Sequence, residues 1–219
     1  MKNVLEKNSR WMDHSENFDL ILEEFRSAVS GSRDLICEVG VNRGGSMKSF
    51  MDALPTDQKN WFISIDPFGS IGYHNGAYYT DISVYSNKRY RESMKLLYTH
   101  ADEYNFNYLH LKMTSEDFID CFEHLRVYDQ CSQKLDKFCF VFLDGSHDLK
   151  IVEKEIDFFL NYLTVNGRIV VDDIDINIDS DFFIKLIKEW EEKNLKINFD
   201  KKIRQRTIIR FEKINEKIM

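Results

Sequence analysis

Two acidic motifs, each directly after a short apolar run, carry side chains that could bind a metal ion or take part in catalysis. Asp144-Gly145-Ser146-His147 follows the run FCFVFL, and Asp172-Asp173 follows RIVV. If these runs are neighbouring parallel strands, about 4.8 Å apart, the carboxylates of Asp144, Asp172 and Asp173 converge at one edge of a sheet. A divalent cation such as Mg²⁺ would relieve their repulsion and orient an oxygen nucleophile. The alternative is a polar loop in which Asp173 or Asp175 caps the next helix.

His147 stands three residues after Asp144, close enough to the same edge to accept a proton from a metal-bound hydroxyl. The ordinary pKa of histidine suits a general base near neutral pH. The alternative is a residue in the first turn of a helix that is hydrogen-bonded to the backbone. Asp144 and His147 are therefore the candidate catalytic residues.

A glycine-rich turn follows the first apolar run, LICEV, and leads into a helical pattern. It extends from Glu38 to Ser46 and contains Gly40, Gly44 and Gly45. Glycines at such a turn let the backbone approach a ligand, and the following helix offers free N–H groups. The spacing ExGxxxGG differs from the GxGxxG of dinucleotide-binding proteins.

The second apolar run, WFISI, ends at Asp66, 26 residues after Gly40. An acid at the tip of that strand is well placed to accept hydrogen bonds from ribose hydroxyls. Together with the glycine turn, Asp66 predicts a nucleoside-containing cofactor. The alternative is a tight turn followed by a solvated strand end.

Short apolar runs alternate with amphipathic stretches, which is the pattern of βαβ units around a parallel sheet. Continuously apolar runs, typical of strands buried on both faces, are Leu35–Val39, Trp61–Ile65, Asn107–Leu111, Phe138–Leu143 and Arg168–Val171. Helices are predicted around Phe18–Val29, over Ser46–Leu54, Asn87–Tyr104, Ser115–Leu125 and Leu149–Leu163, and after Ser180. The segments LKINFD and RQRTIIRF predict a final hairpin. The expected fold class is α/β, a Rossmann-like, doubly wound and mostly parallel seven-stranded sheet with helices on both faces and an antiparallel C-terminal hairpin.

Residues 1–219 are predicted to form one domain, because the chain has only two prolines and no low-complexity linker. Residues 1–33 would form an N-terminal helical segment. The insertion over residues 67–86 is rich in Tyr and Gly and would hang over the edge where the second strand ends. There Tyr73, His74, Tyr78 and Tyr79 would belong to a lid or an acceptor pocket. An ordinary exposed loop is an equally good interpretation.

The composition excludes several classes of protein. A formal net charge of -7 argues against a protein that binds the phosphate backbone of nucleic acids. The four cysteines form no CxxC pair and have no histidine at zinc-ligand spacing, so they are expected to be reduced thiols. No signal-peptide core and no membrane-length apolar stretch is present, which predicts a cytoplasmic protein without a membrane partner.

The motifs ICEVGVNRGGS, SIDPFG, FVFLDGSH and IVVDDID, in this order between Leu35 and Asp175, resemble those of the class I methyltransferases. Within that class the chain is most similar to the metal-dependent small-molecule O-methyltransferases of the macrocin and mycinamicin sugar type and to the related methyltransferase 24 group. The first motif is common to the superfamily, whereas the paired DGSH and DD motifs are more selective. The resemblance implies S-adenosylmethionine and Mg²⁺, or another divalent cation, as cofactors.

The resemblance also implies roles for individual residues. Glu38, Gly40 and Gly44 would line the methionine and ribose side of the cofactor, Asp66 would hold the ribose, and Ser115 and Glu116 would border the adenine. The implied cofactor-binding set is Glu38, Gly40, Gly44, Ser46, Asp66, Ser115, Glu116 and Asp144.

The implied metal ligands are Asp144, Asp172 and Asp173. In catechol-type enzymes the base is a lysine three residues after the first metal-binding aspartate. This chain has His147 at that position, which leaves the identity of the base open.

The resulting hypothesis is metal-assisted methyl transfer from S-adenosylmethionine to a hydroxyl of a small polar acceptor, such as a sugar or sugar nucleotide, in a natural-product or polysaccharide pathway. One alternative is a nicotinamide-dependent oxidoreductase, which the turn spacing and the lack of a Tyr-x-x-x-Lys run in a matching place disfavour. Another is a catalytically silent cofactor-binding protein. The sequence leaves open whether the chain forms a homo-oligomer.

Overall fold

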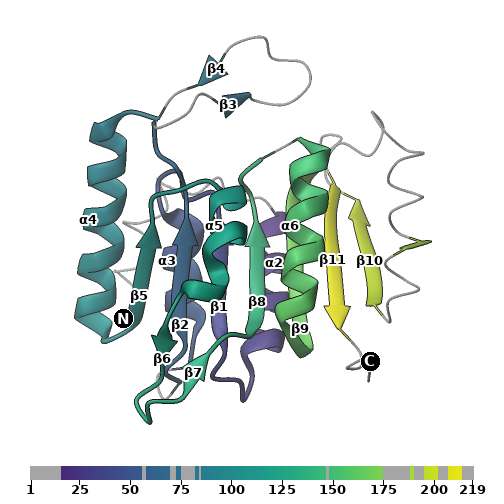
Figure 1. The fold of residues 1–219 in the computed structure, drawn as a ribbon, viewed down its shortest axis with the longest axis horizontal. Helices are drawn as coiled ribbons and strands as arrows, with labels where there is room; N and C mark the ends of the chain where they lie inside the picture. The colour runs from purple at the N-terminus through teal and green to yellow at the C-terminus, as the bar shows by residue number, and fades with distance from the viewer. Residues whose placement is uncertain are drawn as a thin grey trace.

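A single twisted sheet forms the centre of the molecule (Figure 1). The computed structural model describes residues 16–55, 58–69, 73–74, 82–83, 85–146, 148–174, 188–189, 195–201 and 207–213. Within these ranges, seven strands form the sheet in the order β10-β11-β9-β8-β1-β2-β5. Their bounds are β1 Leu35–Val39, β2 Trp61–Ile65, β5 Asn107–Leu111, β8 Phe138–Leu143, β9 Leu163–Ile174, β10 Leu195–Lys201 and β11 Thr207–Lys213.

The strand directions confirm the predicted α/β architecture. Strands β1, β2, β5, β8 and β9 are parallel. Strand β11 is antiparallel to both β9 and β10, so the chain ends in the predicted antiparallel hairpin. The tips of the parallel strands therefore share one edge of the sheet, toward the top of Figure 1, which we call the rim.

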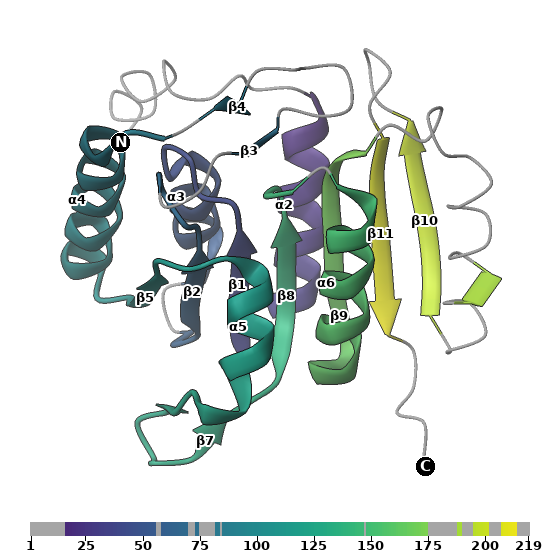
Figure 2. The same cartoon turned by 45° about the horizontal axis from the view of Figure 1, so that its top comes forward.

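Helices cover both faces of the sheet, as Figure 2 also shows. Helices α2 (Glu16–Val29), α3 (Gly45–Ala53) and α4 (Asn87–Tyr104) pack on one face and contribute to the same core cluster. Helices α5 (Ser115–Cys121) and α6 (Leu149–Tyr162) pack on the other face, followed in the case of α5 by the 3₁₀ turn η1 (Phe122–His124).

Strands β1 and β8 are buried on both faces because they lie between these helical layers. Side chains along a strand point alternately to its two faces, so a strand in this position is apolar at nearly every residue, Glu38 of β1 being the exception. In β8, Phe138 and Val141 enter the core under α6, whereas Phe140 and Phe142 enter the core under α2 and α3. This explains why the uninterrupted run FCFVFL predicts a central strand.

Several element bounds differ from the sequence-based expectation. Strand β9 begins at Leu163 rather than Arg168, because the chain pairs with β8 before and after an irregular stretch in which Asn166 has a φ of 64°. Helix α6 accordingly ends at Tyr162. Helix α5 ends at Cys121 instead of Leu125, and the chain tightens there into the i→i+3 pairing of η1.

Short two-stranded hairpins extend from the sheet at both ends. Strands β3 (Tyr73–His74) and β4 (Ile82–Ser83) pair within the 67–86 insertion, and the figures place them beyond the rim. Strands β6 (Val127–Tyr128) and β7 (Lys134–Leu135) pair at the opposite end. Tyr78, Tyr79 and the helix expected after Ser180 are outside the described residues, apart from residues 188–189. No helix in the described ranges has the length and apolar character needed to cross a bilayer.

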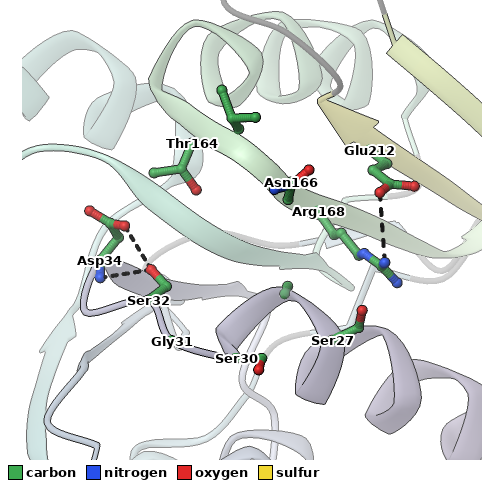
Figure 3. A pocket seen from close by; sticks show the side chains of 11 residues that line it. Ser27, Ser30, Gly31, Ser32, Asp34, Thr164, Asn166, Arg168 and Glu212 are labelled. Carbon is green, nitrogen blue, oxygen red and sulfur yellow. Dashed lines mark hydrogen bonds and ion pairs between the residues drawn. The ribbon is translucent and has the colours of Figure 1, made fainter.

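A partly buried ion-pair network attaches α2 to the sheet at the end opposite the rim. The guanidinium of Arg168 in β9 contacts the carboxylate of Glu24 in α2 and lies 3.8 Å from Oε1 of Glu212 in β11. The side chains of Arg168 and Glu24 are only 18% and 13% exposed. Figure 3 shows the cleft of about 470 Å³ beside this network, which is lined by residues at the end of α2 and the start of β9.

Arg168→Ala is expected to lower the free energy of unfolding by about 2 kcal/mol. The substitution removes the positive charge from between two partly buried carboxylates, and the loss is smaller than for a fully buried pair because water reaches the site. Urea denaturation measures the change. The exposed Arg91 in α4 provides the control, since Arg91→Ala should cost less than about 0.5 kcal/mol. Equal effects of the two substitutions would contradict the assigned role of Arg168.

Candidate cofactor and catalytic site

The register of the sheet brings the predicted acids to the rim. Val39 of β1 pairs with Ile65 of β2 and with Leu143 of β8, and Leu143 also pairs with Val171 of β9. The next residue after each of these positions is Gly40, Asp66, Asp144 and Asp172, respectively. Asp66 and Asp144 therefore lie at the same edge of the sheet, as the sequence predicts.

The glycine turn lies in close contact with the backbone at the end of β8. Gly40 has a φ of +87°, and a Cβ added there would lie 2.3 Å from the backbone oxygen of Asp144. Gly44, the N-cap residue of α3, has a φ of +77°, and a Cβ there would lie 3.0 Å from the Leu97 side chain. Only glycine fits at Gly40, because any side chain would push the turn away from Asp144.

Asp66 ties this turn to the tip of β2. Its Oδ2 accepts hydrogen bonds from the backbone N–H groups of Val41 and Asn42 at 2.8 and 3.1 Å. Its Oδ1 accepts from the N–H of Phe68 at 2.8 Å, and the residue is 4% exposed. A carboxylate can accept about four hydrogen bonds, so a further donor can still bind. Asp66 thus has a structural role that the sequence-based reasoning missed, and its predicted contact with ribose stays a prediction.

Glu38 is a buried carboxyl directly beneath the glycine turn. Its Oε1 accepts a hydrogen bond from the hydroxyl of Ser46 in α3, so Ser46 orients Glu38. Its Oε2 is buried and has no hydrogen-bond partner. Burial raises the pKa of Glu38 well above its usual value, and Asp144 and Asp66 raise it further, whereas the Ser46 hydrogen bond lowers it. An unpartnered buried oxygen is costly, which suggests that a ligand supplies its donor.

Ser115 and Glu116 begin α5, next to the rim end of β5. The hydroxyl of Thr114 caps this helix by accepting from the N–H of Asp117 at 3.0 Å. Ser115 is buried, whereas Glu116 is exposed and lies 3.8 Å from Nζ of Lys154 in α6. Ser115 therefore faces the interior and Glu116 the surface.

The predicted metal ligands are only partly described. Asp144 is exposed and Asp172 half-buried, and both follow the paired residues Leu143 and Val171. The side chain of Asp173 and all of His147 lie outside the described residues. Among the described side chains, no group of three acids, histidines or cysteines could hold a metal ion. The carboxylates of Asp144 and Asp172 have the chemistry that a hard cation prefers, and the third ligand stays a prediction.

A row of polar side chains one position below the rim was missed by the sequence-based reasoning. Glu38, Ser64 and His110 are register partners on β1, β2 and β5. The Ser64 hydroxyl lies 2.7 Å from the Tyr108 hydroxyl and 2.9 Å from Nδ1 of His110. Burial lowers the pKa of His110 to about 4, and Lys112 lowers it as well, so this imidazole is neutral. The sequence feature that could have indicated this row is a polar residue at the penultimate position of each of three apolar runs.

The strand order, the glycine turn after β1 and the acid after β2 define the Rossmann-like fold of the class I, S-adenosylmethionine-dependent methyltransferases. A family model described as Methyltransferase domain, of the methyltransferase 24 type, matches residues 37–174. The match covers more than half of the chain, and the chain belongs to this methyltransferase family. No curated protein matches it in sequence.

Solved structures of methyltransferases share the fold. An rRNA methylase from Streptococcus thermophilus has a TM-score of 0.57 at 9% identity, over 90% of this chain and 95% of that chain. The O-methyltransferase TomG from Streptomyces achromogenes is involved in tomaymycin synthesis and was solved with S-adenosylmethionine. It has a TM-score of 0.55 at 13% identity, over 89% of this chain and 77% of that chain. An O-methyltransferase from Bacillus cereus, solved with S-adenosylhomocysteine, has a TM-score of 0.55 at 14% identity, over 97% of this chain and 90% of that chain. At these identities the similarity concerns the fold alone.

Proposed function

We propose that this methyltransferase transfers a methyl group from S-adenosylmethionine to a hydroxyl of a small polar acceptor, such as a sugar or sugar nucleotide. The observation that carries the proposal is the unpartnered Oε2 of Glu38 beneath the glycine turn, at the same end of the sheet as Asp66 and Asp144. The ammonium group of the methionine part of the cofactor is a donor suited to this oxygen, because a charged donor offsets the cost of a buried carboxylate.

The glycine turn and Asp66 provide the nucleoside side of the site. Gly40 brings the backbone close to the tip of β8, and the hydrogen bonds from the amides of Val41 and Asn42 to Asp66 hold the turn in that position. One remaining acceptor position of Asp66 would then accept a ribose hydroxyl. Preorganisation of this kind is what methyl transfer needs from the protein, because the sulfonium carbon is already electrophilic.

Asp144 and Asp172, with Asp173, would hold a divalent cation, which when bound lowers the pKa of the acceptor hydroxyl. His147 would accept the proton of that hydroxyl. The acceptor oxygen would form its bond to the methyl carbon, and the carbon–sulfur bond would break with its electron pair left on sulfur, which would yield S-adenosylhomocysteine. The net charge of -7 would repel a phosphate backbone, which favours a small acceptor over nucleic acid.

Methyl transfer from radiolabelled S-adenosylmethionine to a panel of sugars, nucleotide sugars and catechols tests the proposed activity. The expected result is label in a hydroxyl-bearing acceptor with one equivalent of S-adenosylhomocysteine formed. Label in RNA, or in an amine but in no hydroxyl compound, would contradict the proposed acceptor. Binding of S-adenosylmethionine without transfer to any acceptor would instead indicate a silent cofactor-binding protein.

A further inference from the structure

Ser93 is a buried residue of α4 that the proposed function does not use. It is 3% exposed and lies in the middle of the helix. Its Oγ donates a hydrogen bond to the backbone carbonyl of Asn42 at 2.7 Å, and Asn42 belongs to the glycine turn, 51 residues earlier in the chain. Serine forms helices less readily than alanine, and its hydroxyl commonly bonds within its own helix. A bond to another element therefore suggests a role outside α4.

Asn42 has an uncommon backbone conformation within the glycine turn. Its φ is 46°, in the left-handed region that few residues other than glycine and asparagine adopt. Both backbone groups of Asn42 are held by other elements. Its N–H donates to Oδ2 of Asp66 at 3.1 Å, and its carbonyl accepts from Ser93 at 2.7 Å. The turn is thus fixed on one side by the tip of β2 and on the other side by α4.

One face of α4 contacts both turns at the rim. Tyr90, Ser93 and Leu97 follow one another at helical spacing, so they share this face. The ring of Tyr90 contacts that of Phe68, just past the tip of β2, with centroids 5.2 Å apart. Leu97 lies so close to Gly44 that a Cβ added to the glycine would be 3.0 Å from it. Ser93 lies between these two contacts, which fix its position beside the glycine turn.

The hydrogen bond from Ser93 fixes the peptide group between Asn42 and Arg43. Because a peptide group is planar and trans, its carbonyl and its N–H point in opposite directions. A carbonyl held toward α4 therefore directs the N–H of Arg43 away from α4. Without the hydroxyl this peptide group can rotate more easily, and the backbone groups that the turn presents at the rim would then change direction.

We propose that Ser93 is a positioning residue for the cofactor, which keeps the glycine turn in its binding conformation through the carbonyl of Asn42. The inference rests on the proposed binding of S-adenosylmethionine at this turn. Loss of the hydroxyl would divide the turn between its binding conformation and others, and the apparent affinity falls in proportion to the fraction that remains competent. One lost hydrogen bond corresponds to a loss of about five- to tenfold in affinity.

Calorimetric titration with S-adenosylhomocysteine tests the proposal on two variants of nearly equal shape. Ser93→Thr keeps the hydroxyl and Ser93→Val replaces it by a methyl group, so any cost of the added bulk is common to both. The Kd of Ser93→Val should be about five- to tenfold higher than that of Ser93→Thr. Ser93→Ala adds no bulk and favours the helix, and it should show the same loss relative to the wild-type protein.

Steady-state kinetics with an acceptor from the panel above distinguish positioning from a general loss of folded protein. Ser93→Ala should raise the KM for S-adenosylmethionine about five- to tenfold and leave kcat within about twofold of the wild-type value. The reason is that the hydrogen bond affects cofactor binding and not the reacting groups. A smaller folded fraction would instead lower the apparent kcat and leave KM unchanged.

Thr164→Val is the matched control, because it removes a hydroxyl that donates to a backbone carbonyl, that of Phe138, at the end of the sheet opposite the rim. It should leave the Kd and the KM unchanged. Equal Kd values of Ser93→Thr and Ser93→Val, or a wild-type Kd and KM in Ser93→Ala, would overturn the role of Ser93 while leaving the proposed function intact. Absence of binding by the wild-type protein would overturn the proposed function itself.

Discussion

Gly40→Ala is expected to abolish binding of S-adenosylhomocysteine, with a loss of at least about a hundredfold in affinity. A methyl group at this position would lie 2.3 Å from the Asp144 backbone oxygen and 2.7 Å from the Cα of Gly145. Because both neighbours are backbone atoms, no side-chain rotation relieves the clash, and the turn must separate from β8. Calorimetry measures the loss of binding, and circular dichroism reports whether the sheet persists.

Gly31→Ala is the control for Gly40→Ala. It shows the cost of placing alanine at a positive φ when no steric clash is present. Gly31 has a φ of +74°, similar to that of Gly40, but an added Cβ there meets nothing within 4 Å. We expect a loss of about 1 kcal/mol in stability and an unchanged cofactor affinity. If Gly40→Ala binds S-adenosylhomocysteine as well as Gly31→Ala does, the close approach of the turn to β8 is unimportant for the site.

Asp144→Ala is the second substitution with a large expected effect, a fall of about 10³-fold in kcat for methyl transfer. Asp144 is placed at the end of β8 next to Gly40 and beside the strand that carries Asp172, so it is common to the proposed cation and acceptor sites. Initial rates at saturating S-adenosylmethionine measure the effect. Asp120→Ala, at an exposed position of α5, is the control and should retain full activity.

The contribution of a cation is tested by the same assay in the presence of a chelator. Wild-type activity should be lost in excess chelator and recovered with Mg²⁺ or Mn²⁺, whereas Asp144→Ala should not respond to either ion. Full wild-type activity in chelator would refute metal assistance but would leave methyl transfer in place.

The strands at the centre of the sheet could be predicted to the residue. Phe138–Leu143 and Leu35–Val39 are buried on both faces, so their continuous apolar runs begin and end with the strands themselves. The start of β9 could not be predicted, because Asn166 and Gly167 indicate a turn when only local sequence is considered. In the structure the flanking residues nevertheless pair with β8, since Leu163 lies opposite Phe138.

The convergence of Gly40, Asp66, Asp144 and Asp172 on one edge could also be predicted, because the tips of parallel strands must share an edge. The roles of individual side chains at this edge could not be predicted from the sequence in the same way. Asp66 binds three backbone amides, and this role depends on how the glycine turn folds back over β2. The hydrogen bond between Ser64 and His110 likewise joins residues that are 46 positions apart in the sequence. Contacts between elements far apart in sequence decided both cases.

Binding of the methyl donor is the most direct measurement, because the proposed function requires a nucleoside-binding edge built from Gly40, Asp66 and Glu38. Titration of the wild-type protein with S-adenosylmethionine and with S-adenosylhomocysteine should give saturable heats with one site per chain, whereas NAD should give none. Saturable binding of NAD, with no heat from either sulfur compound, would contradict the account and favour an oxidoreductase.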